Sequence, residues 1–146
     1  MKRNIIVLVL FLSTFAYAFG QNAKADLSNE TMLSESDFAK AKDLYLKMCN
    51  SESFKLMREN SLILVGKLGY IDNLDFYLTE ENFINWISLH LSETKFNSVE
   101  EAIELRKVCL ESQRKLDSEN KEVYELIKLA SKEQVREILK PHRLRL

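Results

Sequence analysis

Hydrophobic residues recur every three to four positions along most of this chain, and that spacing predicts α-helices. The alternation typical of strands is absent, and the helix-favouring residues leucine, lysine and glutamate dominate. We expect helices over residues 35–49, 52–68, 80–92, 98–117 and 119–140. A continuous apolar run at residues 62–65 leaves a short strand open as an alternative there. The chain is therefore predicted to be all-α, a single compact bundle of four to six helices.

Start and stop signals set the expected helix boundaries. The predicted N-caps all carry a short hydroxyl side chain, which can accept from the first free N–H groups: Ser34, Ser51, Thr79, Ser98 and Ser131. Glu101 and Gln134 follow two of these caps by three residues, as in a capping box. If the capping box at Ser131 begins a new helix, the last predicted segment forms two helices and not one. Gly66 and Gly69 are expected to stop the second helix, and Pro141 the last.

The N-terminal twenty residues have the three-part layout of a secretory signal peptide. Lys2 and Arg3 precede an apolar run over residues 5–12, and small and polar residues follow. The run is shorter than the roughly 20 residues that a helix needs to span a bilayer. Ala18 and Gly20 predict cleavage before Gln21. Cleavage directed by the pair Ala16 and Ala18, a cut after Ala25 and an uncleaved anchor are the alternatives.

The predicted signal peptide determines the domain organisation and the compartment that we expect. We expect a signal peptide over residues 1–20, a flexible leader over 21–33 and a helical domain over 34–146, in a secreted or periplasmic protein. Cleavage would leave 126 of the 146 residues and, by removing two cations, change the formal net charge from −1 to −3. That weak negative charge argues against nucleic acid or an anionic membrane as the main partner. After cleavage no apolar stretch is long enough for membrane insertion.

The two cysteines, Cys49 and Cys109, are expected to form a disulfide, because an even pair in an oxidising compartment is usually joined. Ala102, Leu105, Cys109 and Leu116 share one helical stripe, so the Cys109 side chain is expected to face inward. Two separate buried thiols are one alternative. A catalytic thiol is another, and it would need a neighbouring base that the sequence does not place.

No motif for a metal, a cofactor or a reaction is present in the sequence. It has two histidines, His90 and His142, and no glycine-rich phosphate loop or nucleophile elbow. Asp72, Asn73 and Asp75 lack the glycine and glutamate that a calcium loop requires. Paired carboxylates are explained as solvated first turns and faces of helices: Glu80 with Glu81, Glu100 with Glu101, and Glu133 with Glu137. We therefore predict no catalytic residues, no bound metal and no cofactor.

Aromatic and acidic residues gather between the second and third predicted helices. The expected partner-binding residues are Tyr70, Asp72, Asp75, Phe76, Tyr77, Glu80, Glu81 and Trp86. In one interpretation the rings of this segment complete the core. In the other, part of the segment is exposed, as a hot spot with an acidic rim suited to a basic partner. The third helix is apolar nearly all round, which predicts a central or covered position.

These observations favour a non-enzymatic, secreted or periplasmic binding protein that holds a protein partner, in the manner of an inhibitor or immunity protein. That comparison is an analogy of size, compartment and helix content only. One alternative is a carrier of a small apolar ligand in a cavity between helices. Another is a small secreted enzyme. The sequence specifies neither the partner nor the oligomeric state.

Overall fold

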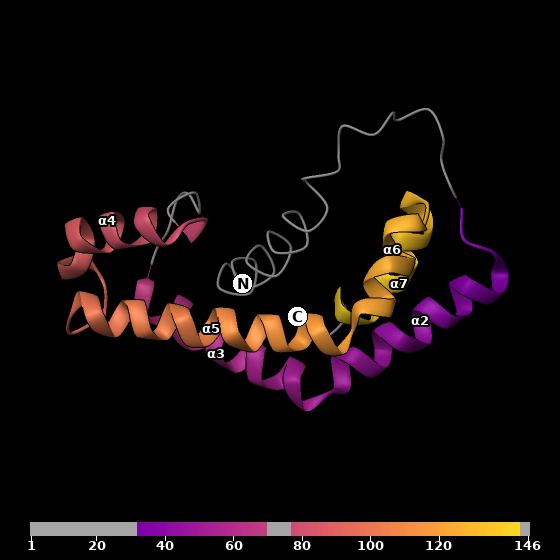
Figure 1. The fold of residues 1–146 in the computed structure, drawn as a ribbon, viewed down its shortest axis with the longest axis horizontal. Helices are drawn as coiled ribbons and strands as arrows, with labels where there is room; N and C mark the ends of the chain where they lie inside the picture. The colour runs from indigo at the N-terminus through magenta and orange to yellow at the C-terminus, as the bar shows by residue number, and fades with distance from the viewer. Residues whose placement is uncertain (1–31, 70–76, 144–146) are drawn as a thin grey trace. The chain divides into compact units, whose positions relative to one another are not determined.

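The structure, a computed structural model, describes residues 32–69 and 77–143. The predicted signal peptide, the leader up to residue 31, and four predicted site residues lie outside this part: Tyr70, Asp72, Asp75 and Phe76. Within the described residues every element is helical, which confirms the all-α prediction. The elements are α2 (Glu35–Asn50), α3 (Glu52–Leu68), α4 (Glu80–His90), the 3₁₀ turn η2 (Leu91–Glu93), α5 (Val99–Glu119), α6 (Lys121–Leu129) and α7 (Lys132–Arg143) (Figure 1).

All five predicted caps are confirmed. The hydroxyl oxygens of Ser34 and Thr79 accept from the backbone N–H three residues later, each at 3.1 Å. Ser51, Ser98 and Ser131 accept from the equivalent N–H at 3.2, 3.2 and 3.3 Å. Each cap replaces a hydrogen bond that the first helical turn cannot make internally. The residue types at the boundaries are therefore the local reason why these helices begin where they do.

Two of the three residues expected to end a helix do not do so. Gly69 ends α3 as predicted, with φ 83° and its N–H donating to the carbonyl of Val65 at 3.1 Å. Gly66 lies inside α3 and does not stop it. Helix α7 continues through Pro141 to Arg143. A proline beyond the first turn removes one N–H from the helical ladder and crowds the carbonyl four residues earlier, which is why the sequence predicted a stop that the structure does not show.

The described helices fall into two compact units, each with its own buried residues. Of the described residues, unit 1 contains 32–55 and 115–143, and unit 2 contains 56–69 and 77–114. In unit 1, α2 packs against α6 and α7. The three-to-four-residue spacing of apolar positions in α2 places Ala41, Tyr45 and Met48 in the core, each at most 1% exposed, whereas Phe38 and Leu44 of the same stripe are half-buried.

Unit 2 is built around one hydrophobic cluster to which three helices contribute. Its buried members are Leu64 and Leu68 of α3, Phe83 and Ile87 of α4, Ala102 and Cys109 of α5, and Phe96 before α5. Cys109 faces inward as the stripe predicted. The third predicted helix, α4, does not occupy the central or covered position that its apolar residues predicted. Phe83 and Ile87 are fully buried, but Leu89 on the other side of α4 is 80% exposed.

Candidate partner-binding surface

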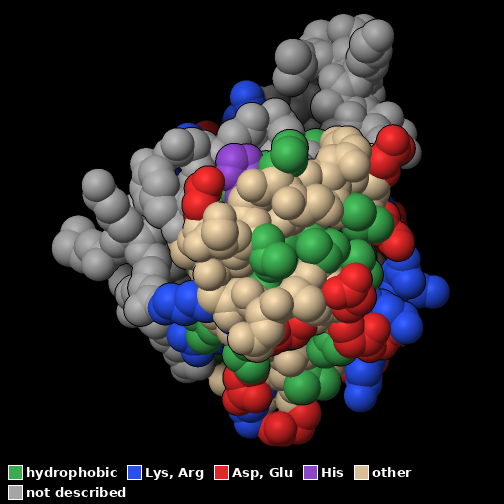
Figure 2. All heavy atoms as spheres, turned by 90° about the vertical axis from the view of Figure 1, so that its left-hand side faces the viewer, with side chains coloured by type: hydrophobic (Ala, Val, Ile, Leu, Met, Phe, Trp, Pro, Cys, Tyr) green, Lys and Arg blue, Asp and Glu red, His purple; other side chains and the backbone are tan. Residues whose placement is uncertain are grey.

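Helix α4 presents one side to solvent, and this side is the candidate partner-binding surface. Six exposed residues of this side and of the approach to it are together called the α4 surface: Leu78, Glu80, Glu81, Asn82, Asn85 and Leu89. Leu78 and Leu89 are 55% and 80% exposed. Figure 2 views unit 2 from the end at which α4 terminates and shows hydrophobic side chains on this face, with both acidic and basic side chains around them. Exposed apolar groups with polar residues around them are typical of protein-binding surfaces.

The acidic part of this surface lies in the first turn of α4. Glu80 and Glu81 follow the cap residue Thr79 and are both exposed. The positive end of the helix dipole stabilises carboxylates at this position. Neither forms an ion pair with any residue in the described ranges. Their negative charge is therefore unneutralised within this part of the chain and is directed at solvent.

The two predicted ring residues that the structure describes pack against the core of unit 2. Tyr77 and Trp86 are half-buried against the hydrophobic cluster. The Tyr77 ring meets Phe83 edge to face, with ring centroids 5.9 Å apart and an interplanar angle of 87°. Burial raises the pKa of the Tyr77 hydroxyl, and the nearby Cys109 adds to that effect, whereas Arg106 opposes it. Tyr77 is therefore a neutral phenol at physiological pH.

Trp86 has a second contact along its own helix. The His90 ring stacks on it, with centroids 4.8 Å apart and an angle of 24° between the planes. Nδ1 of His90 lies 3.2 Å from a carboxylate oxygen of Glu93 in η2. Four-residue spacing places Trp86 and His90 one turn apart on the same face. This stack fixes both rings at the edge of the α4 surface.

Arg106 of α5 is the residue near this surface that sequence reasoning missed. It is 7% exposed, and its Nη2 donates to the backbone carbonyl of Tyr77 at 3.1 Å. Its guanidinium lies 5.1 Å from the Tyr77 ring centroid and 5.5 Å from that of Phe83. Leu78 and Leu89 were also missed, because a helix with apolar residues on every side gives no signal for which leucine stays uncovered. A single arginine within a charged helical segment gives no signal of burial.

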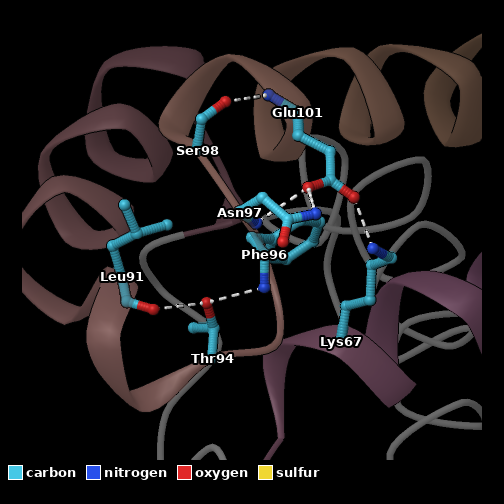
Figure 3. Close-up of polar contacts among 7 residues, drawn as sticks. All are labelled: Lys67, Leu91, Thr94, Phe96, Asn97, Ser98 and Glu101. Carbon is cyan, nitrogen blue, oxygen red and sulfur yellow. Dashed lines mark hydrogen bonds and ion pairs between the residues drawn. The ribbon is translucent and has the colours of Figure 1, made fainter.

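A second polar cluster connects α3 to the start of α5 (Figure 3). Lys67 of α3 forms an ion pair with Glu101. The other carboxylate oxygen of Glu101 accepts from the backbone N–H and the side-chain amide of Asn97, at 2.8 and 2.9 Å. The hydrogen bond from Lys67, followed by the one from the Asn97 N–H, lowers the pKa of Glu101 to about 2. These contacts anchor the start of α5, and they give the Glu101 carboxylate a structural role.

The predicted disulfide is wrong in this structure: Cys49 and Cys109 are both thiols. Cys49 lies at the end of α2 in unit 1, whereas Cys109 belongs to the hydrophobic cluster of unit 2. Cys109 packs as a small apolar group within the hydrophobic cluster of unit 2, as in the alternative of two separate thiols. Burial raises the pKa of its thiol to about 11, which leaves little of the nucleophilic thiolate at neutral pH.

Two kinds of functional feature are absent from the described part of the chain. Residues 32–69 and 77–143 bring together no group of three or more His, Cys, Asp or Glu side chains able to hold a metal ion. Over the same residues, no helix combines the length and apolar character needed to cross a bilayer.

Comparison with protein-family models, with curated proteins and with solved structures gives no significant match for this chain.

Proposed function

We propose that this protein is a non-enzymatic, secreted or periplasmic binding protein that holds a basic protein partner on the α4 surface, as an inhibitor or immunity protein does. The observation that supports this function is that α4 is buried on one face and exposes apolar and acidic side chains on the other. Phe83 and Ile87 are fully buried in unit 2, whereas Leu89 on the same helix is 80% exposed. A helix anchored on one face presents the other with little conformational entropy left to lose on binding.

The chemistry of the α4 surface defines the partner. Leu89 offers an apolar contact, and covering it would contribute about 2 kcal/mol. Asn82 and Asn85 offer amide donors and acceptors beside it. Glu80 and Glu81 add two negative charges that would attract lysine and arginine side chains and guide association. The expected partner is therefore a protein with an apolar recess bordered by basic residues.

Site-specific photo-crosslinking tests this proposal. A photoreactive residue placed at Leu89, in protein expressed in its native host, should give one adduct with a protein carrying a basic surface. The matched control places the same residue at Leu129, an exposed leucine of unit 1 that is 55% exposed. No adduct at Leu89, or the same adducts at both positions, would show that the α4 surface is not the binding site.

Charge reversal tests the acidic part of the surface. The double substitution E80K/E81K should lower the adduct yield at Leu89 at least tenfold. The control E35K/E133K changes the net charge equally and also replaces exposed first-turn acids, but on α2 and α7 of unit 1. Equal losses in both variants would indicate a general charge effect and contradict recognition by Glu80 and Glu81.

Export is tested on the protein isolated from its host. The proposed signal peptide predicts a mature chain that begins at Gln21, outside the cytoplasm. Intact mass and N-terminal sequencing of each cell fraction measure this directly. A cytosolic protein that retains residues 1–20 would contradict the proposed compartment.

A further inference from the structure

Arg106 of α5 is almost completely buried in unit 2, and it has few polar partners among the residues that the structure describes. Its side chain is 7% exposed. It donates one hydrogen bond, to the carbonyl of Tyr77, and its buried Nε has no hydrogen-bond partner among the residues that the structure describes. A guanidinium has five N–H donors, and burying a charge costs free energy unless its partners compensate. Stability alone is therefore a poor explanation for an arginine at this position.

What Arg106 contacts is the segment that leads into the α4 surface. The carbonyl that it binds belongs to Tyr77, which directly precedes the exposed Leu78. Its guanidinium lies within 5.5 Å of the ring centroids of Tyr77 and Phe83, one on each side of the cap of α4. The hydrogen bond spans 29 residues of sequence. One side chain of α5 thus contacts both the approach to α4 and its first turn.

We infer that Arg106 is a positioning residue that holds the N-terminal end of α4, and with it Leu78, Glu80 and Glu81, in the orientation that binds the partner. A planar guanidinium suits this task, because it donates in its plane and stacks on aromatic rings through its faces. The hydrogen bond fixes the backbone at Tyr77, and the ring contacts fix that segment relative to Phe83. The consequence for binding rests on the proposed function, whereas the consequence for local order does not.

Substitution with methionine separates positioning from general support of the core. R106M keeps an apolar stem of similar length and removes both the buried charge and its unpaired Nε. Replacing a buried charge by an apolar side chain is often neutral or stabilising for the fold as a whole. We therefore expect the urea midpoint of R106M to stay close to that of the wild type. Hydrogen exchange at the backbone amides of Asn82 and Phe83, both bonded to Thr79, should accelerate at least tenfold.

The comparison amides lie elsewhere in the chain. The N–H of Gly69, bonded to Val65 at the end of α3, reports on the rest of unit 2. The N–H of Asp37, bonded to Ser34, reports on unit 1. Acceleration at Asn82 and Phe83 alone supports the inference. Equal acceleration at Gly69 would show that Arg106 supports the whole of unit 2 and would overturn the positioning role, as would no acceleration at all.

Two more variants complete the test. R106K keeps a cation that can donate to the Tyr77 carbonyl, so it should restore most of the protection lost in R106M. K107M removes a neighbouring exposed charge from α5 and should change neither exchange nor crosslinking.

The adduct yield at Leu89 should fall at least tenfold in R106M and recover in R106K. Absence of an adduct in the wild type refutes the proposed function alone, because the exchange data still decide whether Arg106 orders α4.

Discussion

The side-chain amide of Gln134 binds both backbone groups of Leu33, a residue 101 positions earlier in the chain. The N–H of Leu33 donates to Oε1 of Gln134 at 2.9 Å, and Nε2 of Gln134 donates to the carbonyl of Leu33 at 3.0 Å. The same Oε1 also accepts from the N–H of Ser131 at 3.2 Å, which completes the predicted capping box. One glutamine therefore caps α7 and fixes the chain just before α2 in unit 1.

We predict that Q134A destabilises the protein by about 1–2 kcal/mol, because it removes the glutamine half of the capping box and leaves the backbone groups of the buried Leu33 without these bonds. Urea unfolding measures the change, and hydrogen exchange at the Leu33 amide should accelerate with it. The control E133A alters an exposed neighbour on the same helix and should stay within about 0.5 kcal/mol. Equal stability of Q134A and E133A would show that the clamp contributes nothing.

The ion pair between Lys67 and Glu101 predicts a pH dependence of stability. The pKa of Glu101 is lowered from 4.5 to about 2 in the folded protein. The folded state therefore binds the proton less readily than the unfolded state. The stabilisation is fully present above the unfolded value near 4.5 and is lost as the pH falls toward 2.

Urea unfolding at pH 6 and at pH 2.5 tests this dependence. E101Q should be less stable than the wild type at pH 6, and the difference should shrink at pH 2.5. E104Q, which changes an exposed acid on the outer face of the same helix, should show no such change. A constant difference between E101Q and the wild type across this range would contradict the assigned role of the carboxylate.

The burial of Cys109 predicts unequal thiol reactivity. Its pKa rises from 9.0 to about 11, which lowers the fraction of thiolate at pH 8 roughly 100-fold. In the native protein a disulfide reagent such as DTNB should modify the half-buried Cys49 well before Cys109, and in urea both should react alike. Peptide mapping identifies the modified site. A Cys49–Cys109 disulfide in the purified native protein would contradict the reduced state described here.

The left-handed backbone at Gly69 predicts a cost for any side chain there. With φ at 83°, G69A should lose about 1–2 kcal/mol, because a Cβ strains this conformation. Space is not the reason, since the nearest atom to an added Cβ is the Glu93 carbonyl oxygen at 3.9 Å. G69N should lose less, because asparagine tolerates this region better. Thermal unfolding distinguishes strain from crowding: crowding would penalise the larger asparagine more.

Much of the fold was predictable because its signals are local. Caps at Ser34 and Thr79, and the stripe of α2, depend on groups three or four residues apart, which any helical backbone brings together. The candidate site was predictable only in part. Glu80 and Glu81 are exposed, and Tyr77 and Trp86 follow the interpretation in which the rings of this segment complete the core, a choice that the sequence left open.

The sequence by itself determined that the described chain is helical, where its helices begin and which stripe of α2 or α5 is buried. Only the tertiary structure decided that Leu89 stays exposed, that Arg106 is buried beneath Tyr77 and that Gln134 binds Leu33. The physical reason is the sequence separation of the interacting groups. A helical period and a cap involve residues within about one turn of each other. Burial and long-range hydrogen bonds depend on which distant segment packs against a helix face, and no local sequence pattern specifies that segment.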